Sequence, residues 1–337
     1  MREPHRPVSG SLSNRVRDWP DADLESVAAC PACGSVEREL LYGGLVDQVF
    51  AIAGGEWSLQ RCGACSSAFL DPRPAEHALG RLYAGEYYTH TAPVDPAQPR
   101  RGVKFAFRAR ALLDPRFRFA HARLTRHLQL PRAGARLLDV GCGSGQFVAS
   151  ARALGWDASG IDTDAVAVEA GRSAGLPLST TTLEEIARTE PGSFDAVTME
   201  HVLEHVPDPG AFLRAARRVL RRSGTLWLAT PNIHAAAHSR FGRAWKHLDP
   251  PRHLVIFTSA ALEVQLHAAG FGEVQARRSA SGTIDTYKHS WRIGQGSRPL
   301  ADIPIPPRVA MEGQLVGLRS LLGRARAEEL VRITRPA

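Results

Sequence analysis

The segment from Arg136 to Gly145 constrains the fold of this chain more than any other stretch. It reads Arg-Leu-Leu-Asp-Val-Gly-Cys-Gly-Ser-Gly, so an apolar run meets an acidic residue and then three alternate glycines. Glycine tolerates positive φ angles and lets the backbone approach a ligand closely, and a helix that starts after such a turn offers unpaired amides to an anion. The segment therefore predicts a strand, a ligand-binding turn and a helix in succession.

From this segment onward, short apolar runs alternate with stretches of helical periodicity. We expect strands at residues 136–140, 157–161, 196–199, 225–229 and 273–277. We expect helices at residues 146–153, 163–174, 209–220 and 259–269. This alternation is typical of an α/β fold with a doubly wound, mostly parallel, Rossmann-like sheet wrapped by helices.

The whole chain divides into five predicted regions. The first is polar and contains proline, which favours disorder, and the second contains paired cysteines. A Pro-rich linker and basic, amphipathic helices come next, and the α/β domain is followed by a C-terminal extension with one helix. The predicted boundaries are 1–27, 28–90, 91–127, 128–282 and 283–337.

Composition narrows the class of protein. The 42 basic residues against 34 acidic ones give a formal net charge of +8, which favours anionic partners, although GC-rich coding also enriches arginine. No run of about 18 apolar residues is found, which argues against a membrane-spanning helix. The first thirty residues lack the apolar core of a secretory signal. We therefore expect a cytoplasmic protein without a membrane partner.

Four of the five cysteines form two Cys-x-x-Cys pairs. Cys30 with Cys33 and Cys62 with Cys65 are separated by 28 residues, and two such knuckles can give four sulfurs the tetrahedral arrangement that zinc prefers. We predict a structural zinc ribbon, since four protein ligands leave no position for water. A redox pair and free thiols are the alternatives, and a redox pair would need a thioredoxin-like pattern that is missing here.

The glycine-rich turn departs from the dinucleotide fingerprint, because Gln146 stands where the third glycine of that fingerprint would fall. It resembles motif I of the class I S-adenosylmethionine-dependent methyltransferases, and the resemblance extends from about Arg136 to Gly272. In that family the acidic residue of the turn orients the methionine end of the cofactor, which implies this role for Asp139. The acidic residue that ends the second strand binds the ribose, which implies Asp162. The implied cofactor-binding residues are Asp139, Gly141, Cys142, Gly143, Gly145, Asp162, Leu183 in the adenine-contacting turn, and Glu200.

The catalytic candidates follow the fourth predicted strand and the loop after the fifth. Ligands of open parallel sheets bind beyond the carboxyl ends of the strands, where His201, Glu204 and His205 occur in sequence. In a helical turn His201 and His205 would stack at i and i+4. A neutral histidine suits a general base, and the candidates are His201, His205 and His253.

Two further interpretations concern the same residues. His201-x-x-Glu204-His205 formally matches an inverted zinc-protease pattern. It is also similar to the Glu-x-x-Glu-His segment of the ubiquinone-pathway O-methyltransferases, which binds a divalent ion, with His201 in place of the first glutamate. The loop with His253 resembles the acceptor-side loop of zinc-ribbon methyltransferases from sugar, polysaccharide and antibiotic pathways, and Arg252 there is a candidate clamp for a phosphate or carboxylate.

The resemblance implies methyl transfer from S-adenosylmethionine to a small-molecule acceptor, such as a sugar, glycan or antibiotic-type intermediate. An RNA methyltransferase is the first alternative, because some rRNA-modifying enzymes join a zinc ribbon to this fold and the chain is basic. Methyltransferases that act on base amino groups carry an Asn/Asp-Pro-Pro-aromatic segment. Asp249-Pro250-Pro251-Arg252 imitates this segment but lacks the aromatic residue that would stack on a base. A non-catalytic scaffold that binds the cofactor is the second alternative.

Overall fold

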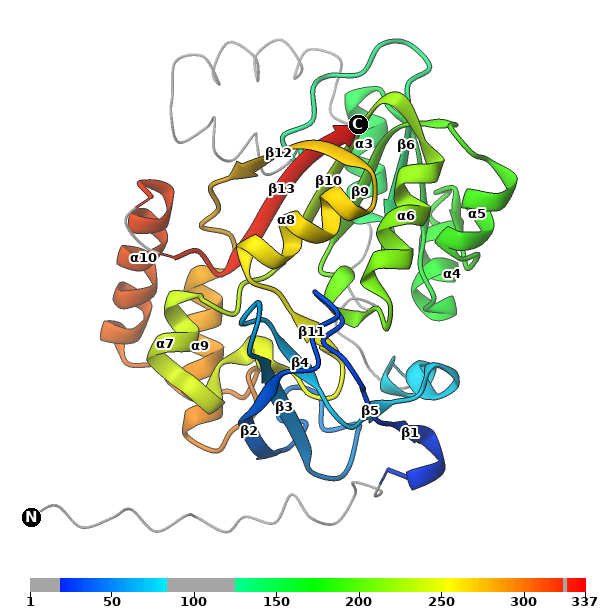
Figure 1. Ribbon diagram of the computed structural model, residues 1–337. Coiled ribbons are helices and arrows are strands. Elements are labelled where there is room, and N and C mark those ends of the chain that lie inside the picture. Colours follow the sequence, from blue (N-terminus) through cyan, green and yellow to red (C-terminus); the bar gives the residue numbers. More distant parts are fainter. Residues whose placement is uncertain (1–18, 84–124, 324–325) are drawn as a thin grey trace, which may run out of the picture.

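The computed structural model describes residues 19–83, 125–323 and 326–337 (Figure 1). Most of the predicted leader and nearly all of the predicted linker with its amphipathic helices lie outside these residues. Within them, a seven-stranded sheet, a four-stranded sheet and one two-stranded pairing are found. None of the helices in these ranges is both long and apolar enough to cross a bilayer.

The seven-stranded sheet confirms the predicted fold class. Its strands run in the order β12-β13-β10-β9-β6-β7-β8, and β6 to β10 are parallel to one another, whereas β13 is antiparallel to β10 and β12. The bounds are β6 (Arg136–Val140), β7 (Asp157–Ile161), β8 (Leu178–Ser179), β9 (Phe194–Glu200), β10 (Leu220–Pro231), β12 (Phe271–Arg277) and β13 (Glu329–Pro336).

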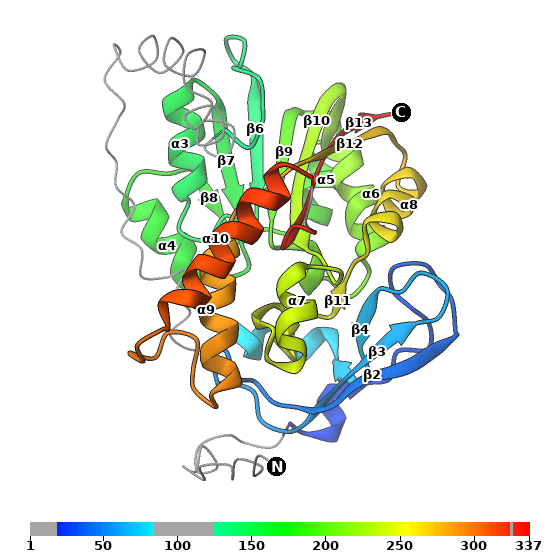
Figure 2. The same ribbon diagram turned by 90° about the vertical axis from the view of Figure 1, so that its left-hand side faces the viewer.

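Helices cover both faces of this sheet. Figure 2 shows α3 (Gln146–Leu154) and α4 (Ala165–Ser173) on one face, and α5 (Leu183–Thr189), α6 (Pro209–Val219) and α8 (Ser259–Ala268) on the other. Side-chain caps explain where several of them start, since Asp164, Thr182, Asp208 and Thr258 each accept a hydrogen bond from an amide of the first turn. The other α-helices among the described residues are α7 (Ala236–Phe241), α9 (Thr283–Gly294) and α10 (Pro307–Leu321).

The cysteine-bearing part is joined to the large sheet's domain by a shared sheet. Its strands β2 (Arg38–Leu45), β3 (Trp57–Cys62) and β4 (Ala68–Leu70) are followed in the order by β11 (Val255–Ile256), which comes from the loop after β10. β1 (Leu24–Glu25) pairs with β5 (Arg73–Pro74) before the 3-10 helix η2 (Glu76–Tyr83). The ribbon is thus continuous with the segment that carries His253.

Two predicted boundaries need correction. The predicted disordered leader extends to residue 27, yet Leu24 and Glu25 form a strand that pairs with residues 73–74. The predicted extension from residue 283 contains two helices and β13, and β13 inserts between β10 and β12. The α/β domain therefore continues to the end of the chain, because its sheet is incomplete without this last strand.

Candidate active site and zinc centre

The glycine turn between β6 and α3 has the geometry that its sequence predicts. Gly141, Gly143 and Gly145 have φ angles of 70°, 52° and 85°, a region that disfavours side chains. A Cβ built on Gly141 would come within 2.4 Å of Val202 Cγ2. The turn is therefore packed directly against the segment that leads to His205.

Asp162 is bound to this turn from the neighbouring strand end. Its Oδ2 accepts a hydrogen bond from the Gly143 amide at 2.7 Å, and its Oδ1 accepts one from the Asp164 amide at 2.9 Å. The helix cap is Asp164, whose side chain accepts from two amides of α4. Asp162 is thus not a helix cap, and its carboxylate lies at the mouth of the turn, where a ribose role remains a prediction.

Two of the predicted cofactor-binding residues turn inward. The amide of Cys142 donates to Ile161 O at 3.1 Å, and its thiol packs so closely on β7 that a Cβ on Gly160 would meet the sulfur at 2.7 Å. The cofactor contact predicted for Cys142 stays a prediction for its backbone alone, because its side chain belongs to the core. Leu183 begins α5 and is buried, so its predicted adenine contact rests on its backbone alone.

Asp139 and Glu200 share a partner that sequence reasoning missed. The Arg126 guanidinium pairs with the Asp139 carboxylate and donates to Glu200 Oε2 at 2.8 Å, while the Thr198 hydroxyl donates to Asp139 Oδ1 at 2.7 Å. Burial raises the pKa of Asp139, and the charge of Arg126 opposes this shift. Arg126 also lies over the ring of Phe147, at 3.7 Å from its centroid. Nothing local to Arg126 signals this contact, which depends on the sheet.

His201 is held between two carboxylates and does not serve as a base. Its Nδ1 is 2.9 Å from Glu204 Oε1 and its Nε2 is 3.1 Å from Glu329 Oε1. Carboxylates only accept, so both ring nitrogens donate and the ring is an imidazolium. Burial lowers the pKa of His201, but the two carboxylates outweigh it and raise the pKa well above its ordinary value. The base prediction for His201 is corrected, since neither nitrogen has a free lone pair.

Glu204, one of the two carboxylates that hold His201, is buried. It accepts from the Thr230 hydroxyl at 2.9 Å as well as from His201. Burial raises its pKa, yet the hydrogen bond and charge of His201 dominate and lower it to about 2. The expected i, i+4 stacking is also wrong, because η4 (Leu203–His205) is a 3-10 turn that does not include His201. The His201 ring pairs instead with the Glu204 carboxylate at i+3.

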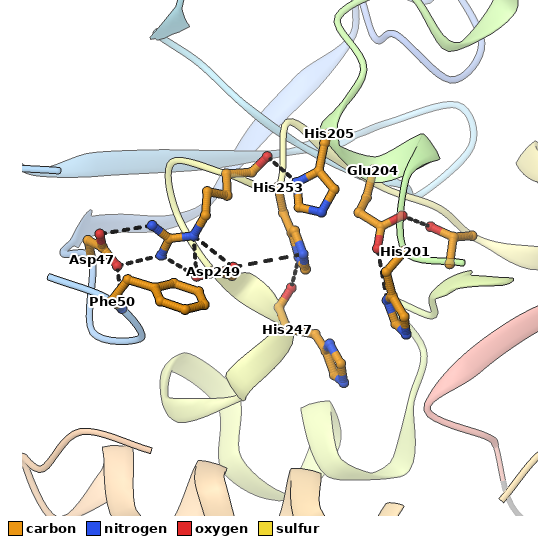
Figure 3. A network of polar contacts seen from close by, with 10 residues as sticks. Asp47, Phe50, His201, Glu204, His205, His247, Asp249 and His253 are labelled. Atoms are coloured by element: carbon orange, nitrogen blue, oxygen red, sulfur yellow. Dashed lines mark hydrogen bonds and ion pairs between the residues drawn. The ribbon is translucent and has the colours of Figure 1, made fainter. Parts of the chain in front are cut away.

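His205 and His253 each have a ring nitrogen, Nε2, without a hydrogen bond among the described residues (Figure 3). His205 Nδ1 donates to Arg252 O at 3.0 Å, and His253 Nδ1 donates to His247 O at 2.7 Å. A carbonyl can only accept, so each Nδ1 carries the proton and each Nε2 exposes a lone pair when the ring is neutral. Burial and the nearby His205 lower the pKa of His253 to about 4, which keeps that ring neutral. The two rings meet edge to face at 4.9 Å.

Arg252 holds the His205 ring through its backbone carbonyl, and its side chain does not clamp a ligand. Its side chain is fully buried, its Nη1 donates to Asp47 Oδ2 at 3.0 Å, and its Nε donates to Asp249 Oδ2 at 3.1 Å. Phe50 of the ribbon stacks on its guanidinium at 4.3 Å. The clamp prediction is corrected, because every face of the guanidinium is occupied by protein.

His247 and Tyr83 complete the walls of the site. The His247 ring is parallel to His201 at 5.8 Å and to His253 at 6.4 Å, and burial lowers its pKa well below the ordinary value. Tyr83, the last residue of η2, meets His205 edge-on at 6.2 Å. The four histidines thus come from two loops, one after β9 and one after β10. The cysteine-bearing part of the chain, through Tyr83, lines one side of the site.

The same residues could also hold a cation. Ligand atoms of Glu204, His205 and His253 all lie within 4.8 Å of one another, and both histidines donate Nδ1–H to a carbonyl, as metal-bound histidines commonly do. A base and a metal ligand both require the Nε2 lone pair, so the geometry fits either use.

The four paired cysteines have the geometry of a zinc site. Cys30 Sγ lies 3.8 Å from Cys65 Sγ, and Cys33 Sγ lies 3.5 Å from Cys62 Sγ. Tetrahedral zinc with bonds of about 2.3 Å separates its sulfurs by about 3.8 Å. The Cys65 amide points at Cys62 Sγ, at 3.5 Å. These four residues fit a structural zinc ion, whereas a disulfide would need a far shorter separation.

The knuckles are tied to the large domain by α8. The Thr258 hydroxyl, which caps α8, donates to Cys65 O at 3.0 Å, and Gln265 Nε2 donates to Ala32 O at 2.9 Å. Thr258 follows directly on the segment that runs from His253 through β11. The zinc ribbon therefore braces the loop that carries one of the two histidine lone pairs.

Comparison with known proteins places part of this chain among methyltransferases. A family model described as a methyltransferase domain matches residues 112–276. A ubiquinone biosynthesis O-methyltransferase of Xanthomonas oryzae pv. oryzae is 44% identical over 115 residues, which cover 32% of this chain and 48% of that protein. Its counterpart in Xanthomonas campestris pv. campestris is 43% identical over 110 residues, covering 31% and 46%. These alignments thus span about half the length of the relatives. A solved S-adenosylmethionine-dependent methyltransferase of Archaeoglobus fulgidus aligns with a TM-score of 0.44 and 17% identity over 68% of this chain and 99% of its own.

Proposed function

We propose that this chain, which contains a class I S-adenosylmethionine-dependent methyltransferase domain, methylates a hydroxyl group of a small molecule. The observation that carries the proposal is the pair of Nε2 lone pairs on His205 and His253, fixed by hydrogen bonds from each Nδ1 to a carbonyl. A hydroxyl must lose its proton as its oxygen attacks a methyl group, so a base within reach is the chemistry that this acceptor needs.

The residues around the glycine turn fit the cofactor. Gly141 and Gly143 leave room for close approach of a ligand, and the Asp162 carboxylate lies where it can accept from ribose hydroxyls. Asp139 and Glu200 lie beside the turn and both pair with Arg126, so the ammonium of the amino-acid part would share these carboxylates with that guanidinium. When bound, S-adenosylmethionine supplies a methyl group already activated by its positive sulfur. The protein then contributes alignment and proton removal.

His205 and His253 have different roles, because they differ in burial. His253 is 5% exposed and neutral, and it keeps the wall of the site polar without charge. His205 is less buried and lies between His253 and Tyr83, so it is the one that accepts the acceptor's proton at Nε2. His201 positions Glu204 and η4 from behind.

The relatives favour oxygen over nitrogen or carbon as the acceptor atom, because the two Xanthomonas proteins named above are O-methyltransferases. A sugar, glycan or antibiotic-type hydroxyl follows from the resemblance of the His253 loop. The burial of residues 249–252 speaks against RNA, since this stretch is enclosed by protein and cannot stack on an extruded base.

Calorimetry with S-adenosylmethionine and with S-adenosylhomocysteine tests the first half of the proposal. We expect both to bind, and Asp162→Asn to weaken both. Incubation with the labelled donor and a panel of phenolic, sugar and amine acceptors tests the second half. Label on amines alone, or failure of the folded protein to bind either cofactor, would refute the function.

A further inference from the structure

Helix α10 carries a stripe of large apolar side chains that face solvent. Met311, Leu315, Leu318 and Leu322 are 57%, 58%, 56% and 54% exposed. Their spacing of four, three and four residues places them on one face of the helix, with Leu322 as its C-cap. Figure 1 puts α10 at the outer edge of the molecule, and Figure 2, turned toward that edge, shows it in front.

The opposite face of α10 explains why the stripe cannot turn inward. Gly313 and Gly317 are buried there, and a Cβ on Gly313 would lie 3.1 Å from Ile284 Cα of α9. Small residues let the two helices approach closely, so α10 is fixed in rotation. Its stripe is therefore held outward by packing.

This concentration is unusual for the molecule. Eleven large apolar side chains are exposed among the described residues, and four of them form this stripe. No other helix or strand in that part of the chain carries more than one of them. Scattered exposed apolar residues need no explanation, whereas a contiguous patch marks an interaction surface.

The charges beside the stripe are positive. Arg308 and Arg319 lie three turns apart on one border of the stripe and are exposed. Arg278 donates to Leu321 O at 3.0 Å and adds a third guanidinium at the C-terminal end. The acidic residue of α10, Glu312, is ion-paired with Arg240 at 3.0 Å. The border thus presents arginines without a carboxylate free to pair with them.

These charges decide which partner can cover the apolar stripe of α10. A second copy would bring the same arginines and no free carboxylate on its own α10. Residues 84–124 of this chain contain eight Lys or Arg against three Asp or Glu, so they would also add like charge. An anionic lipid surface supplies both an apolar layer and negative headgroups, the combination that interfacial amphipathic helices use.

We propose that α10 binds an anionic phospholipid surface, with its stripe in the acyl boundary and Arg308 and Arg319 on the headgroups. This inference is independent of the proposed methyl transfer, and it departs from the expectation from the sequence that the chain has no membrane partner. The full-length protein should sediment with vesicles of phosphatidylcholine and phosphatidylglycerol in equal parts, and not with vesicles of phosphatidylcholine alone. Binding should fall as salt is raised.

Two variants separate the apolar and charged contributions. Leu315→Gln with Leu318→Gln should weaken binding by roughly tenfold or more, and Arg308→Gln with Arg319→Gln should weaken it by roughly fivefold per arginine. The controls are Val264→Gln, an exposed apolar residue of α8, and Arg222→Gln, an exposed arginine of β10. Both should bind as the wild type does.

A direct readout does not depend on losing affinity. The emission of Leu318→Trp should shift to the blue with mixed vesicles, because the indole leaves water. Unaltered vesicle binding by the double leucine variant, or no shift for Leu318→Trp, would overturn the proposal. A wild-type dimer that becomes a monomer in the leucine variant, with no vesicle binding by either, would also overturn it by identifying a second copy as the occupant.

Discussion

Asp47 of the zinc ribbon and Arg252 of the loop after β10 form a buried ion pair across 205 positions of sequence, with Arg252 Nη1 3.0 Å from Asp47 Oδ2. The backbone carbonyl of the same arginine fixes the tautomer of His205. A residue of the ribbon thus reaches the candidate base through one intermediate side chain.

Asp47→Asn should reduce both stability and acceptor turnover. The asparagine leaves Asp249 as the remaining carboxylate that compensates the buried Arg252 charge, so the loss should be up to about 3 kcal/mol. Chemical denaturation should show this loss, and kcat/KM for the acceptor should fall while the affinity for S-adenosylmethionine stays unchanged. Arg61→Gln is the matched control, because its pair with Glu39 is exposed and surface pairs contribute roughly 0.5 kcal/mol. Equal effects of the two variants would contradict the proposed brace.

Zinc should be needed for acceptor turnover and not for donor binding. Cys33→Ser removes one of four ligands, so the ribbon should lose zinc and release the Thr258 and Gln265 contacts at α8. Metal analysis would measure the zinc content, the melting temperature would report the lost contacts, and calorimetry would measure the affinity for the donor. Cys142→Ser should keep its full zinc content, because that cysteine lies in the glycine turn. Zinc retained by Cys33→Ser would argue against the four-cysteine site.

His205→Gln should lower kcat by about 100-fold or more, the usual contribution of a general base. The loss should shrink as pH rises, because the acceptor hydroxyl then ionises without help. His267→Gln on the exposed face of α8 should behave as the wild type. A His205→Gln enzyme with unchanged kcat across the pH range would remove His205 from the reaction.

The sequence predicted what neighbouring residues determine and missed what distant ones determine. The bounds of β6 and β7 were correct to the residue, because apolar runs between turn residues define short buried strands. By contrast, β13 pairs with strands that precede it by about fifty residues or more. Arg126 and Glu329 were missed for the same reason, since their partners Asp139 and His201 are near only in the folded chain.

The charge state of His201 shows the limit most clearly. Its sequence context, three residues before Glu204 and four before His205, suits a base or a metal ligand equally well. Glu329 decides between them, because it occupies the second ring nitrogen, and it stands 128 positions later. The local sequence pattern identifies the cluster of ionisable groups. Their roles depend on the sheet topology, which brings Glu329 to His201.

Gly141→Ala should weaken S-adenosylmethionine binding at least tenfold. The new Cβ would meet Val202 Cγ2 at 2.4 Å and would also sit at a φ of 70°, so the turn must move. Gly134→Ala separates these effects, because Gly134 has the same φ of 70° with nothing within 4 Å of the built Cβ. That control should lose roughly 1 kcal/mol of stability and keep its affinity for the donor. Equal affinities of the two variants would show that the turn does not contact the cofactor.

Glu328 should make the protein less stable as pH rises from about 4.5 to about 7. Its carboxyl is buried, accepting from Trp245 Nε1 at 3.2 Å and from the Ala237 amide at 3.1 Å. Burial outweighs these hydrogen bonds and raises its pKa to about 7. Because the folded state holds this proton more tightly than the unfolded state does, the stabilisation is complete below the unfolded pKa and is lost as pH passes the folded one. The expected loss is on the order of 3 kcal/mol.

Denaturation across this range should show a slope of unfolding free energy against pH that Glu328→Gln reduces, whatever the absolute stability of the variant. Identical slopes in the two proteins would mean that Glu328 is already ionised at pH 5.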